Sequence, residues 1–299
     1  MHKKGIAAAS VMAFLLVVLA GTATAGLTPT PLTGGEPGTV LLYNFDEFEG
    51  HDVVIRDETV LDSSPHGRHG EFSGGTRVYD SEIGGVDFGR ALRNNSTGHA
   101  PRTPVETLPE SFFKDTFTIE AWFTLDSIGS DNRFFSSRGA HGWNWIMSLQ
   151  DGGSTLRVHD GSSWENNVLT GLDLPTGQWS HWAMVFNNLN PGEEDVMYEV
   201  DWYVTDPFTH TEPNLVGSFT LDSVRTATQM WSSRLYYADA DGSHALGGTD
   251  ADRHDDIRVS IGVTQFEALG LRPVVPIPEP AGLSLLGLAL LGLKRRKRS

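Results

Sequence analysis

Hydrophobic and polar positions alternate most regularly along the stretch Thr116–Asp126, TFTIEAWFTLD. Every second residue in it is apolar: Phe117, Ile119, Ala121, Phe123 and Leu125. Alternate side chains of a β-strand point to opposite faces of its sheet, so the pattern predicts a strand with one face in a core. Trp122 lies on the other face, and an indole ring is rarely left in water. We therefore expect that face to be covered too, and Glu120 beside it to be paired rather than catalytic.

Short β-prone segments recur along residues 39–270, and Gly, Asn, Asp and Pro separate them. Besides the stretch above, they are Thr39–Phe45, Arg133–Ser137, Trp143–Gln150, Thr155–His159, Trp179–Asn187, Val196–Thr205, Leu215–Leu221, Gln229–Tyr237 and Ile257–Val263. No helical periodicity of useful length occurs between the two ends of the chain. Many strands without crossover helices predict one all-β domain, an antiparallel two-sheet jelly-roll sandwich.

The N-terminus has the three parts of a secretory signal peptide. A basic start at residues 2–4 precedes the apolar run 6–20, and Ala23-Thr24-Ala25 supplies small residues for cleavage before Gly26. Residues 1–25 are therefore predicted to be a signal peptide removed by signal peptidase; an uncleaved anchor is the alternative. Residues 26–38 are rich in Gly, Pro and Thr and are predicted to be a flexible lead-in.

The C-terminus is also predicted to be a targeting segment. A linker at 271–277 precedes Pro278-Glu279-Pro280, the apolar segment 281–293 and a basic end at 294–298 that includes Arg295 and Arg296. The apolar segment has 13 residues, whereas a stable membrane-spanning helix needs about 20. The basic end favours the cytoplasmic side. The order predicts a hydrophobic helix that is a transient inner-membrane tether, with an ordinary C-terminal anchor as the alternative.

Composition narrows the choice of partners. Residues 26–278 hold 37 acidic and 15 basic residues, a net charge of −22. Such a charge repels nucleic acid and anionic membranes, so we expect neither as a partner. It suits cations such as calcium, or neutral sugars, although simple solubility outside the cell explains it equally well. The chain has no cysteine, which excludes disulfides, thiolate nucleophiles and cysteine-bound metals.

Five motifs occur in a fixed order along the body of the chain. They are the turn Leu61–Gly75, Phe88–Leu92 (FGRAL), Phe117–Trp122 (FTIEAW), Gly177–Ala183 (GQWSHWA) and Asp255–Val259 (DDIRV). Together they resemble LamG-like domains of the concanavalin A-like lectin/glucanase superfamily. The resemblance implies a jelly roll with one curved sheet. Tyr198–Asp206 departs from the family's tight hairpin because no Gly follows Asp201, so strand pairing there is expected to be longer or rearranged.

The tail resembles a second known signal. Pro278-Glu279-Pro280 followed by a short apolar segment and a basic end is similar to the PEP-CTERM sorting signal of Gram-negative bacteria. The resemblance implies recognition by an exosortase, a membrane transpeptidase, and removal of the tail. It also implies release to the cell surface or extracellular matrix, in systems that go with exopolysaccharide production.

The carboxylates favour a non-catalytic domain. Glycosidases of the resembled superfold carry three carboxylates on one strand, and Glu199 and Asp201 match the first two. The third position is Tyr203 or Val204, so the pair of carboxyl groups that glycoside hydrolysis generally requires is incomplete. No catalytic residue is predicted; a polysaccharide hydrolase or lyase remains the alternative. His181 alternates with apolar residues and is expected to be a hydrogen-bonded core histidine.

Calcium and sugar sites are the remaining hypotheses. The acidic stretch 239–256 does not fit an EF-hand. The resemblance suggests instead a calcium site that joins an early loop to the last strand through Asp46, Asp256 and Asp62. A solvated acidic loop is the alternative.

Sugars stack their apolar faces on exposed aromatic rings, and the chain has eight tryptophans. Four of them have polar or Gly-rich neighbours and are candidate ligand-binding residues: Trp164, Trp143, Trp145 and Trp202. Core packing is the alternative for most of them. The sequence therefore predicts an exported surface or matrix protein with a non-catalytic LamG-like module that binds polysaccharide or another extracellular polymer. A purely structural matrix protein is a further alternative.

Overall fold

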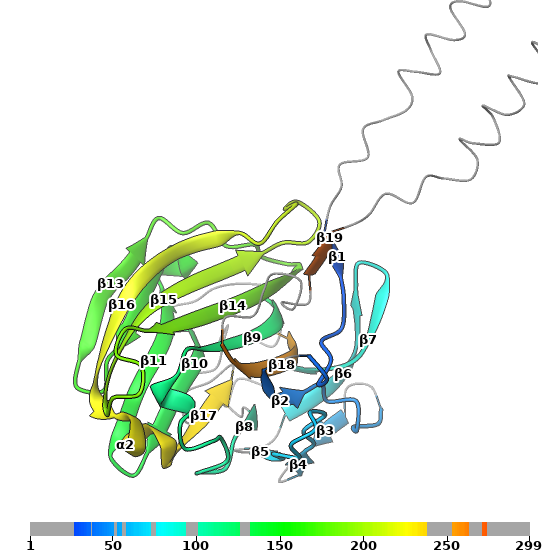
Figure 1. The fold of residues 1–299 in the computed structure, drawn as a ribbon. Helices are drawn as coiled ribbons and strands as arrows, with labels where there is room; N and C mark the ends of the chain where they lie inside the picture. The colour runs from blue at the N-terminus through cyan, green and yellow to red at the C-terminus, as the bar shows by residue number, and fades with distance from the viewer. Residues whose placement is uncertain are drawn as a thin grey trace, which may run out of the picture. The chain divides into compact units, whose positions relative to one another are not determined.

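The computed structural model describes residues 27–36, 38–50, 53–55, 58–72, 76–93, 101–125, 132–237, 253–262 and 271–273 (Figure 1). The chain divides into two compact units, one formed by residues 27–272 and one by both ends, 1–26 and 273–299. The predicted signal peptide and sorting tail lie outside the described residues. Among the residues that are described, no helix is long and apolar enough to cross a membrane.

Two large antiparallel sheets form a sandwich in the unit 27–272 (Figure 1). The nine-stranded sheet has the order β16 (Leu215–Thr226), β15 (Asp195–Thr205), β14 (Trp179–Asn188), β9 (Phe117–Thr124), β18 (Arg253–Ile261), β7 (Val86–Arg93), β6 (Thr76–Ile83) and β3 (Val53–Ile55), with β2 (Thr39–Tyr43) paired to β18. The eight-stranded sheet has the order β13 (Trp164–Thr170), β12 (Thr155–His159), β11 (Gly142–Gln150), β10 (Asn132–Gly139), β17 (Ser233–Tyr237), β8 (Pro101–Arg102), β5 (Gly70–Phe72) and β4 (Thr59–Val60). The predicted fold class is confirmed.

Short elements complete the unit. β1 (Leu27–Pro29) pairs with β19 (Leu271–Pro273), and the helical segments are η1 (Phe112–Lys114), η2 (Asp151–Gly153) and α2 (Ala227–Trp231).

The stretch with the strict alternation is β9, between β14 and β18 near the middle of the nine-stranded sheet. Its residues Phe117, Ile119, Ala121 and Phe123 pack in the core between the sheets. The ring of Phe117 stacks on Phe186 of β14, with their centroids 4.4 Å apart. All eight residues of β9 are buried, so both of its faces are covered, as the sequence indicated.

Residues 27–36 cover part of the outer face of β9. They belong to the segment 26–38 that was predicted to be a flexible lead-in, and that prediction is wrong. Leu27 packs in a second hydrophobic cluster with Trp122, and Leu32 is also buried. Burial of these apolar side chains fixes the segment to the sheet. Because they stand alone among Gly, Pro and Thr, they gave no periodic signal.

The predicted strand Gln229–Tyr237 starts too early. Residues Ala227–Trp231 form helix α2, and strand β17 begins at Ser233. The Thr226 side chain accepts from the Gln229 backbone N–H, while the Gln229 side chain accepts from the Thr226 N–H. This reciprocal capping box starts a helix and outweighs the β-prone residues that follow.

The hairpin that departs from the family pattern is longer, as expected. β15 continues to Thr205 and pairs with β16 along most of its length. The turn begins only at Asp206, whose carboxylate accepts from the Phe208 N–H at 2.8 Å and the Thr209 hydroxyl at 2.7 Å.

Candidate functional site

The outer face of the eight-stranded sheet carries long polar and aromatic side chains because its strands alternate at period two. In β12, Leu156 and Val158 point into the core, whereas Arg157 and His159 are half-buried and lie on the outer face. Tyr236 of β17 also points outward, since both of its neighbours in the strand belong to the core. The sheet thus separates an apolar inner face from a polar and aromatic outer face.

Strand pairing aligns seven outer-face residues from seven neighbouring strands, and we call this line the cross-strand row. In order from β5 to β13 it consists of Glu71, Arg102, Tyr236, Ser136, Ile146, His159 and Trp164. Six interstrand steps give the row a length of about 29 Å. Tyr236, Ser136 and Ile146 at its middle are buried, whereas Trp164 and His159 at one end and Arg102 and Glu71 at the other are half-buried.

Arginines lie on both sides of the cross-strand row. On one side, Arg133 and Arg157 both pair with Ser148 of β11. On the other side, Arg138 pairs with Arg234. Guanidinium groups therefore border the row along both of its long edges.

Aromatic rings hold several of these guanidinium groups. The Cζ atom of Arg157 lies 4.5 Å from the centre of the Trp164 ring, and that of Arg133 lies 5.5 Å from the same ring. The Cζ atom of Arg138 lies 4.8 Å from the centre of the Trp143 ring. A ring face attracts a cation through its quadrupole, so these contacts position the charges on the sheet.

The far end of the row is an ion-pair cluster. Glu71 accepts from Arg102 Nε at 3.1 Å and lies 3.2 Å from Arg234 Nη2. The Arg102 Cζ atom is 5.8 Å from the centre of the Tyr236 ring. Glu71 is thus held by two arginines at this end.

Trp143 and Trp145 have the same parity in the sequence but lie on opposite faces of the sheet. Ser137 pairs with Trp145, and the next residue, Arg138, pairs with Trp143, so Asn144 is an extra residue in β11. Such a bulge shifts the alternation of side chains by one. Trp143 consequently lies with Arg138 on the outer face, with its ring 6.4 Å from that of Tyr236, while Trp145 is fully buried in the core.

The structure corrects two of the four candidate ligand-binding tryptophans. Trp145 and Trp202 have 0% exposure. Trp202 stacks on Phe134 in the core, with ring centroids 5.4 Å apart. A sugar cannot reach either ring, because each is enclosed between the two sheets. Trp143 and Trp164 are half-buried and lie on the outer face.

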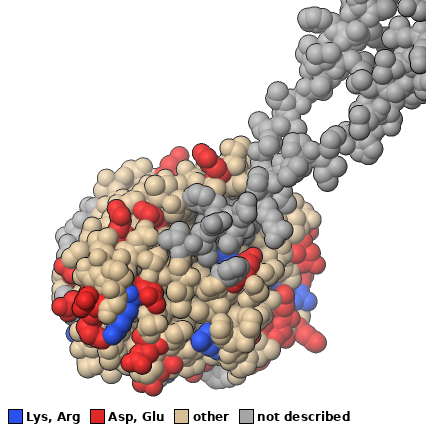
Figure 2. Space-filling view, in the orientation of Figure 1, with Lys and Arg blue, Asp and Glu red and all other residues tan. Residues whose placement is uncertain are grey.

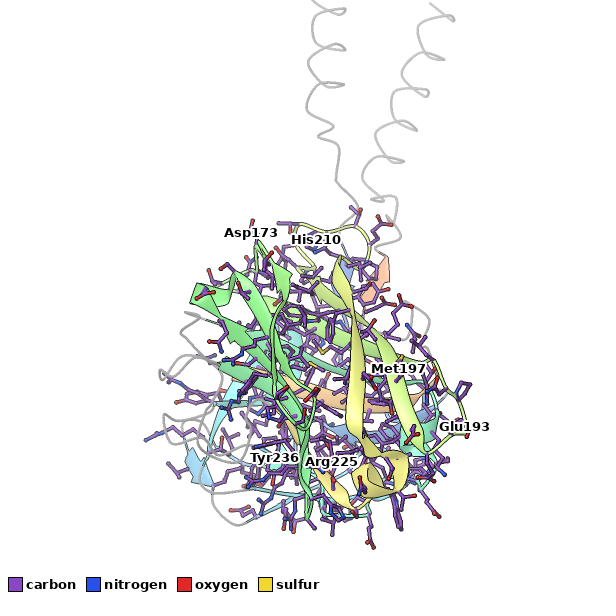
Figure 3. The ribbon with its side chains drawn as sticks, turned by 90° about the vertical axis from the view of Figure 1, so that its left-hand side faces the viewer. Asp173, Glu193, Met197, His210, Arg225 and Tyr236 are labelled. Atoms are coloured by element: carbon purple, nitrogen blue, oxygen red, sulfur yellow. The ribbon has the colours of Figure 1, made fainter. Side chains whose placement is uncertain are left out.

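One end of the outer face is braced by the other sheet. Arg225 of β16 donates from Nε to the carbonyl of Trp143 at 3.4 Å and from Nη2 to the carbonyl of Gly161 at 3.4 Å. Figure 3 shows Arg225 and Tyr236 near one end of the sandwich and Asp173 and His210 at the opposite end. Arg225 therefore fixes the backbone beneath the Trp143 ring.

The electrostatic field of the arginines acts on His159. Burial lowers the pKa of His159, and the charges of Arg133 and Arg157 lower it further, against the opposing effect of Asp160. His159 is therefore neutral at pH 7, and its ring meets Trp164 edge to face, with centroids 5.3 Å apart.

The structure places a second polar group on the outer face of the nine-stranded sheet, beneath residues 27–36. Arg258 donates from Nε to Glu120 at 2.6 Å and is also ion-paired with Glu36. His181 Nε2 lies 3.0 Å from the other carboxylate oxygen of Glu120. Glu120, Arg258 and His181 are fully buried. The prediction that Glu120 is paired is confirmed. His181 is a core histidine, as predicted, but neither of its buried ring nitrogens has a hydrogen-bond partner among the described residues, so the prediction that it is hydrogen-bonded is wrong.

Asp256 fastens the N-terminal segment to this group. Its carboxylate accepts from the Leu32 backbone N–H at 2.6 Å. Burial raises the pKa of Asp256 to about 8, and the charge of Asp46 acts in the same direction. Asp46 itself accepts from the Arg90 N–H at 3.1 Å. Two of the three predicted calcium ligands therefore influence one another.

The third predicted calcium ligand, Asp62, instead binds backbone N–H groups. Its carboxylate accepts from the backbone N–H groups of Leu42, Ser64 and Arg68 at 2.9, 2.9 and 2.6 Å. These bonds shape the turn after residue 61 and tie it to β2. In the described ranges, no group of three or more acidic or histidine side chains could hold a metal ion. Calcium binding stays a prediction.

The carboxylates considered for hydrolysis lie on β15, on the nine-stranded sheet. Glu199 is exposed, and Asp201 accepts from Asn187 Nδ2 at 3.0 Å and from Ser218 Oγ at 2.5 Å. Tyr203 follows on the same face. This strand face has two carboxylates followed by a phenol.

The sequence reasoning missed the arginines of the outer face. Alternation of Arg157 and His159 with Leu156 and Val158 already indicated that these two residues point away from the core. The cross-strand row had no such signal, because it depends on the pairing register of seven strands. The predicted sorting residues Pro278, Glu279, Pro280, Arg295 and Arg296 lie outside the described residues.

Two family models match the chain. Residues 97–198 match the concanavalin A-like lectin/glucanases superfamily, and residues 276–299 match the PEP-CTERM protein-sorting motif. Both predicted resemblances are confirmed. The PEP-CTERM motif implies an exported protein that is anchored transiently at the membrane. No curated protein matches the sequence.

Several solved structures are similar in fold. Domain 4 of AbnA, a GH43 extracellular arabinanase from Geobacillus stearothermophilus in complex with arabinotriose, is 16% identical with a TM-score of 0.44, over 81% of this chain and 98% of that one. Trypanosoma rangeli sialidase in complex with the inhibitor DANA is 16% identical with a TM-score of 0.49, over 81% of this chain and 34% of that one. The receptor binding domain of a botulinum neurotoxin mosaic serotype C/D is 9% identical with a TM-score of 0.43, over 78% of this chain and 49% of that one. Likenesses this distant carry no argument about ligand or activity.

Proposed function

We propose that this is an exported, non-catalytic surface or matrix protein of a Gram-negative bacterium, and that its concanavalin A-like domain binds an extracellular polysaccharide. Signal peptidase removes the N-terminal signal, and an exosortase-type transpeptidase recognises and removes the PEP-CTERM tail. The domain is then released to hold polysaccharide outside the cell.

The cross-strand row is the observation that carries this proposal. It ends at the half-buried Trp164 ring, and the half-buried Trp143 ring lies beside it on the same sheet face, together with guanidinium and imidazole groups. Ring faces pack against the apolar faces of sugars, and polar side chains beside them bind hydroxyl groups.

The carboxylates support the non-catalytic part of the proposal. The Glu199 and Asp201 pair is followed by Tyr203, and Asp201 is already engaged by Asn187 and Ser218. Glu120, a further carboxylate near the middle of the nine-stranded sheet, is buried and bound to Arg258. Neither arrangement supplies an acid and a base on opposite sides of a glycosidic bond.

Retention of the full chain on immobilised polysaccharide tests the proposal, with the producer's own exopolysaccharide as the ligand. We expect retention without release of reducing ends, and weaker retention for Trp164→Ala at unchanged thermal stability. Trp179→Ala, a half-buried tryptophan on the nine-stranded sheet, is the matched control and should retain normally. Reducing-end release would instead indicate a hydrolase, and absence of retention would favour a purely structural matrix protein.

A further inference from the structure

We propose that residues 27–36 are a displaceable strap over a second binding site, on the outer face of the nine-stranded sheet, and that a small carboxylate-bearing sugar binds there when the strap opens. In the closed form, the Glu36 carboxylate occupies the position on Arg258 that the carboxylate of the sugar would take. The site lies on the other sheet from the cross-strand row, so this inference goes beyond the proposed function and does not depend on it.

Three contacts hold the strap, and each is of a different kind. Leu27 packs in the apolar cluster on the outer face of β9. The Leu32 backbone N–H donates to the carboxyl group of Asp256 at 2.6 Å. Glu36 is ion-paired with Arg258. The strap thus places an apolar group, a hydrogen-bond donor and a carboxylate on one patch of the sheet. A uronic sugar carries the same three groups: an apolar face of C–H bonds, hydroxyl donors and a carboxylate.

The groups that receive these contacts lie close together. Trp122 and Glu120 are two residues apart on β9, about 7 Å, and Arg258 is the strand partner of Glu120. Between Asp255 and Arg258, β18 has one residue more than β9, and such a bulge re-aims a side chain. The carboxyl group of Asp256 thereby reaches the strap. An indole ring, a guanidinium group and a carboxyl group therefore meet beneath the strap, at a spacing that suits one sugar ring rather than a polymer.

The strap is a poor match for the polar groups that it covers. Within the part of the chain that the structure describes, Trp122 Nε1 and His181 Nδ1 are buried and have no hydrogen-bond partner. These two residues pair across β9 and β14 and share the outer face. The strap also contains Pro29 and Pro31, which have no backbone N–H to donate. Since buried polar groups are nearly always paired, the hydroxyl groups of a sugar would satisfy atoms that the strap leaves unpaired.

The strap can open without unfolding of the sandwich because few contacts fix it. Its strand β1 has three residues and pairs with β19, which also has three. Leu27 and Leu32 are its buried leucines. Segments with few buried apolar contacts open locally, at a free energy below that of global unfolding. A ligand that binds only the open form then shifts the equilibrium toward it.

The overall charge makes a specific cationic group necessary for any anionic ligand. Residues 26–278 have a net charge of −22, and acidic side chains are spread over the visible face in Figure 2. The field of the whole protein therefore opposes an anion. Arg258 is buried, and a charge pair is stronger there than in water. Because Glu36 already supplies one carboxylate to Arg258, exchanging it for the carboxylate of the sugar leaves the charge of the site unchanged.

Calorimetric titration of the full chain with galacturonate, and with neutral galactose for comparison, tests the site. We expect galacturonate to bind at least about tenfold more tightly than galactose, which lacks the carboxylate. Glu36→Gln removes the competing carboxylate and should increase the affinity for galacturonate about tenfold, because a larger fraction of the protein is then open. Glu199→Gln removes an exposed carboxylate from the same sheet; it is the matched control and should leave the affinity unchanged.

Hydrogen exchange of the backbone amides reports the strap itself. Saturating galacturonate should accelerate exchange of the Leu32 N–H about tenfold, because the ligand holds the strap away from Asp256. The amides of β9 should exchange as before. Glu36→Gln should accelerate exchange at Leu32 even without ligand. Circular dichroism and thermal melting verify that each variant is folded.

Several outcomes would overturn the strap site. These are equal affinities for galacturonate and galactose, no binding of galacturonate by the unsubstituted protein or by Glu36→Gln, and binding without faster exchange at Leu32. Equal gains for Glu36→Gln and Glu199→Gln would also overturn it, since binding would then follow overall charge.

Retention on polysaccharide separates this inference from the proposed function. Saturating galacturonate should not release the protein from immobilised polysaccharide, because the two sites lie on different sheets. Release would place galacturonate in the polysaccharide site and overturn the separate strap site. Absence of any retention, together with galacturonate binding and faster exchange at Leu32, would overturn the proposed function and leave the strap site in place.

Discussion

Replacing Arg258 with Met should destabilise the protein strongly, because Arg258 holds two carboxylates together in the interior. Its guanidinium lies 2.6 Å from Glu120, and both side chains have 0% exposure. Removing one partner of a buried ion pair costs about 3–5 kcal/mol, since the remaining charge is left without compensation. Met keeps much of the volume of the arginine stem, so the lost charge dominates the effect.

Two features of the site set the size of this effect. Burial, and to a smaller extent the nearby Asp256, raise the pKa of Glu120 well above its ordinary value. Without Arg258, the carboxyl can take up a proton, which neutralises part of the charge that is left uncompensated. We therefore expect the lower half of the range, about 3–4 kcal/mol of the unfolding free energy, and a Tm lowered by roughly 6–16 °C.

The assay is denaturant unfolding at pH 7, followed by tryptophan fluorescence. Arg258→Met combined with Glu120→Gln should be less destabilised than the sum of the two single variants by at least about 1.5 kcal/mol, since the uncompensated charge is then absent. The reasoning would be refuted by additive losses, or by a loss below about 1 kcal/mol for Arg258→Met alone.

Three further predictions use other parts of the molecule. Trp145→Ala should cost about 3–5 kcal/mol, whereas Trp143→Ala should cost less than half as much; similar losses would contradict the bulge between them. Asp256 has a folded pKa of about 8, above its unfolded value, so its contribution to stability is complete in acid and is lost as pH rises to about 8. The stability of Asp256→Asn relative to the unsubstituted protein should therefore increase from pH 4 to 8 and then level off; a flat difference would contradict this. Calcium should raise the Tm and protease resistance if Asp46 and Asp256 bind it, and no change in either would reject that site.

The fold could be predicted where local pattern and tertiary environment agree. β9 was predicted because strict alternation over Thr116–Asp126 has a single structural explanation. The covered second face followed from Trp122, because an indole ring is costly to leave in water. The failures have local causes too. The capping box at Thr226 starts a helix ahead of β17, and the pair Leu27 and Leu32 is too sparse to form a period.

The site was less predictable because it depends on register. Because Trp143 and Trp145 are two residues apart, regular alternation predicts that they lie on the same face of the sheet. A single extra residue in β11 places them on opposite faces. The arginines of the outer face come from β8, β10, β12 and β17, which are distant in sequence and meet only through pairing. The sequence of a single strand, without the strands that pair with it, does not show which arginines lie in the same row.

Hydroxyl-radical footprinting with bound polysaccharide tests the central claim most directly, since it reports the solvent access of individual side chains. The outer face of the eight-stranded sheet should be covered, so Trp143 and Trp164 should become protected, while Trp179 on the other sheet should react as before. Protection of Trp179 with no change at Trp143 and Trp164 would contradict the account.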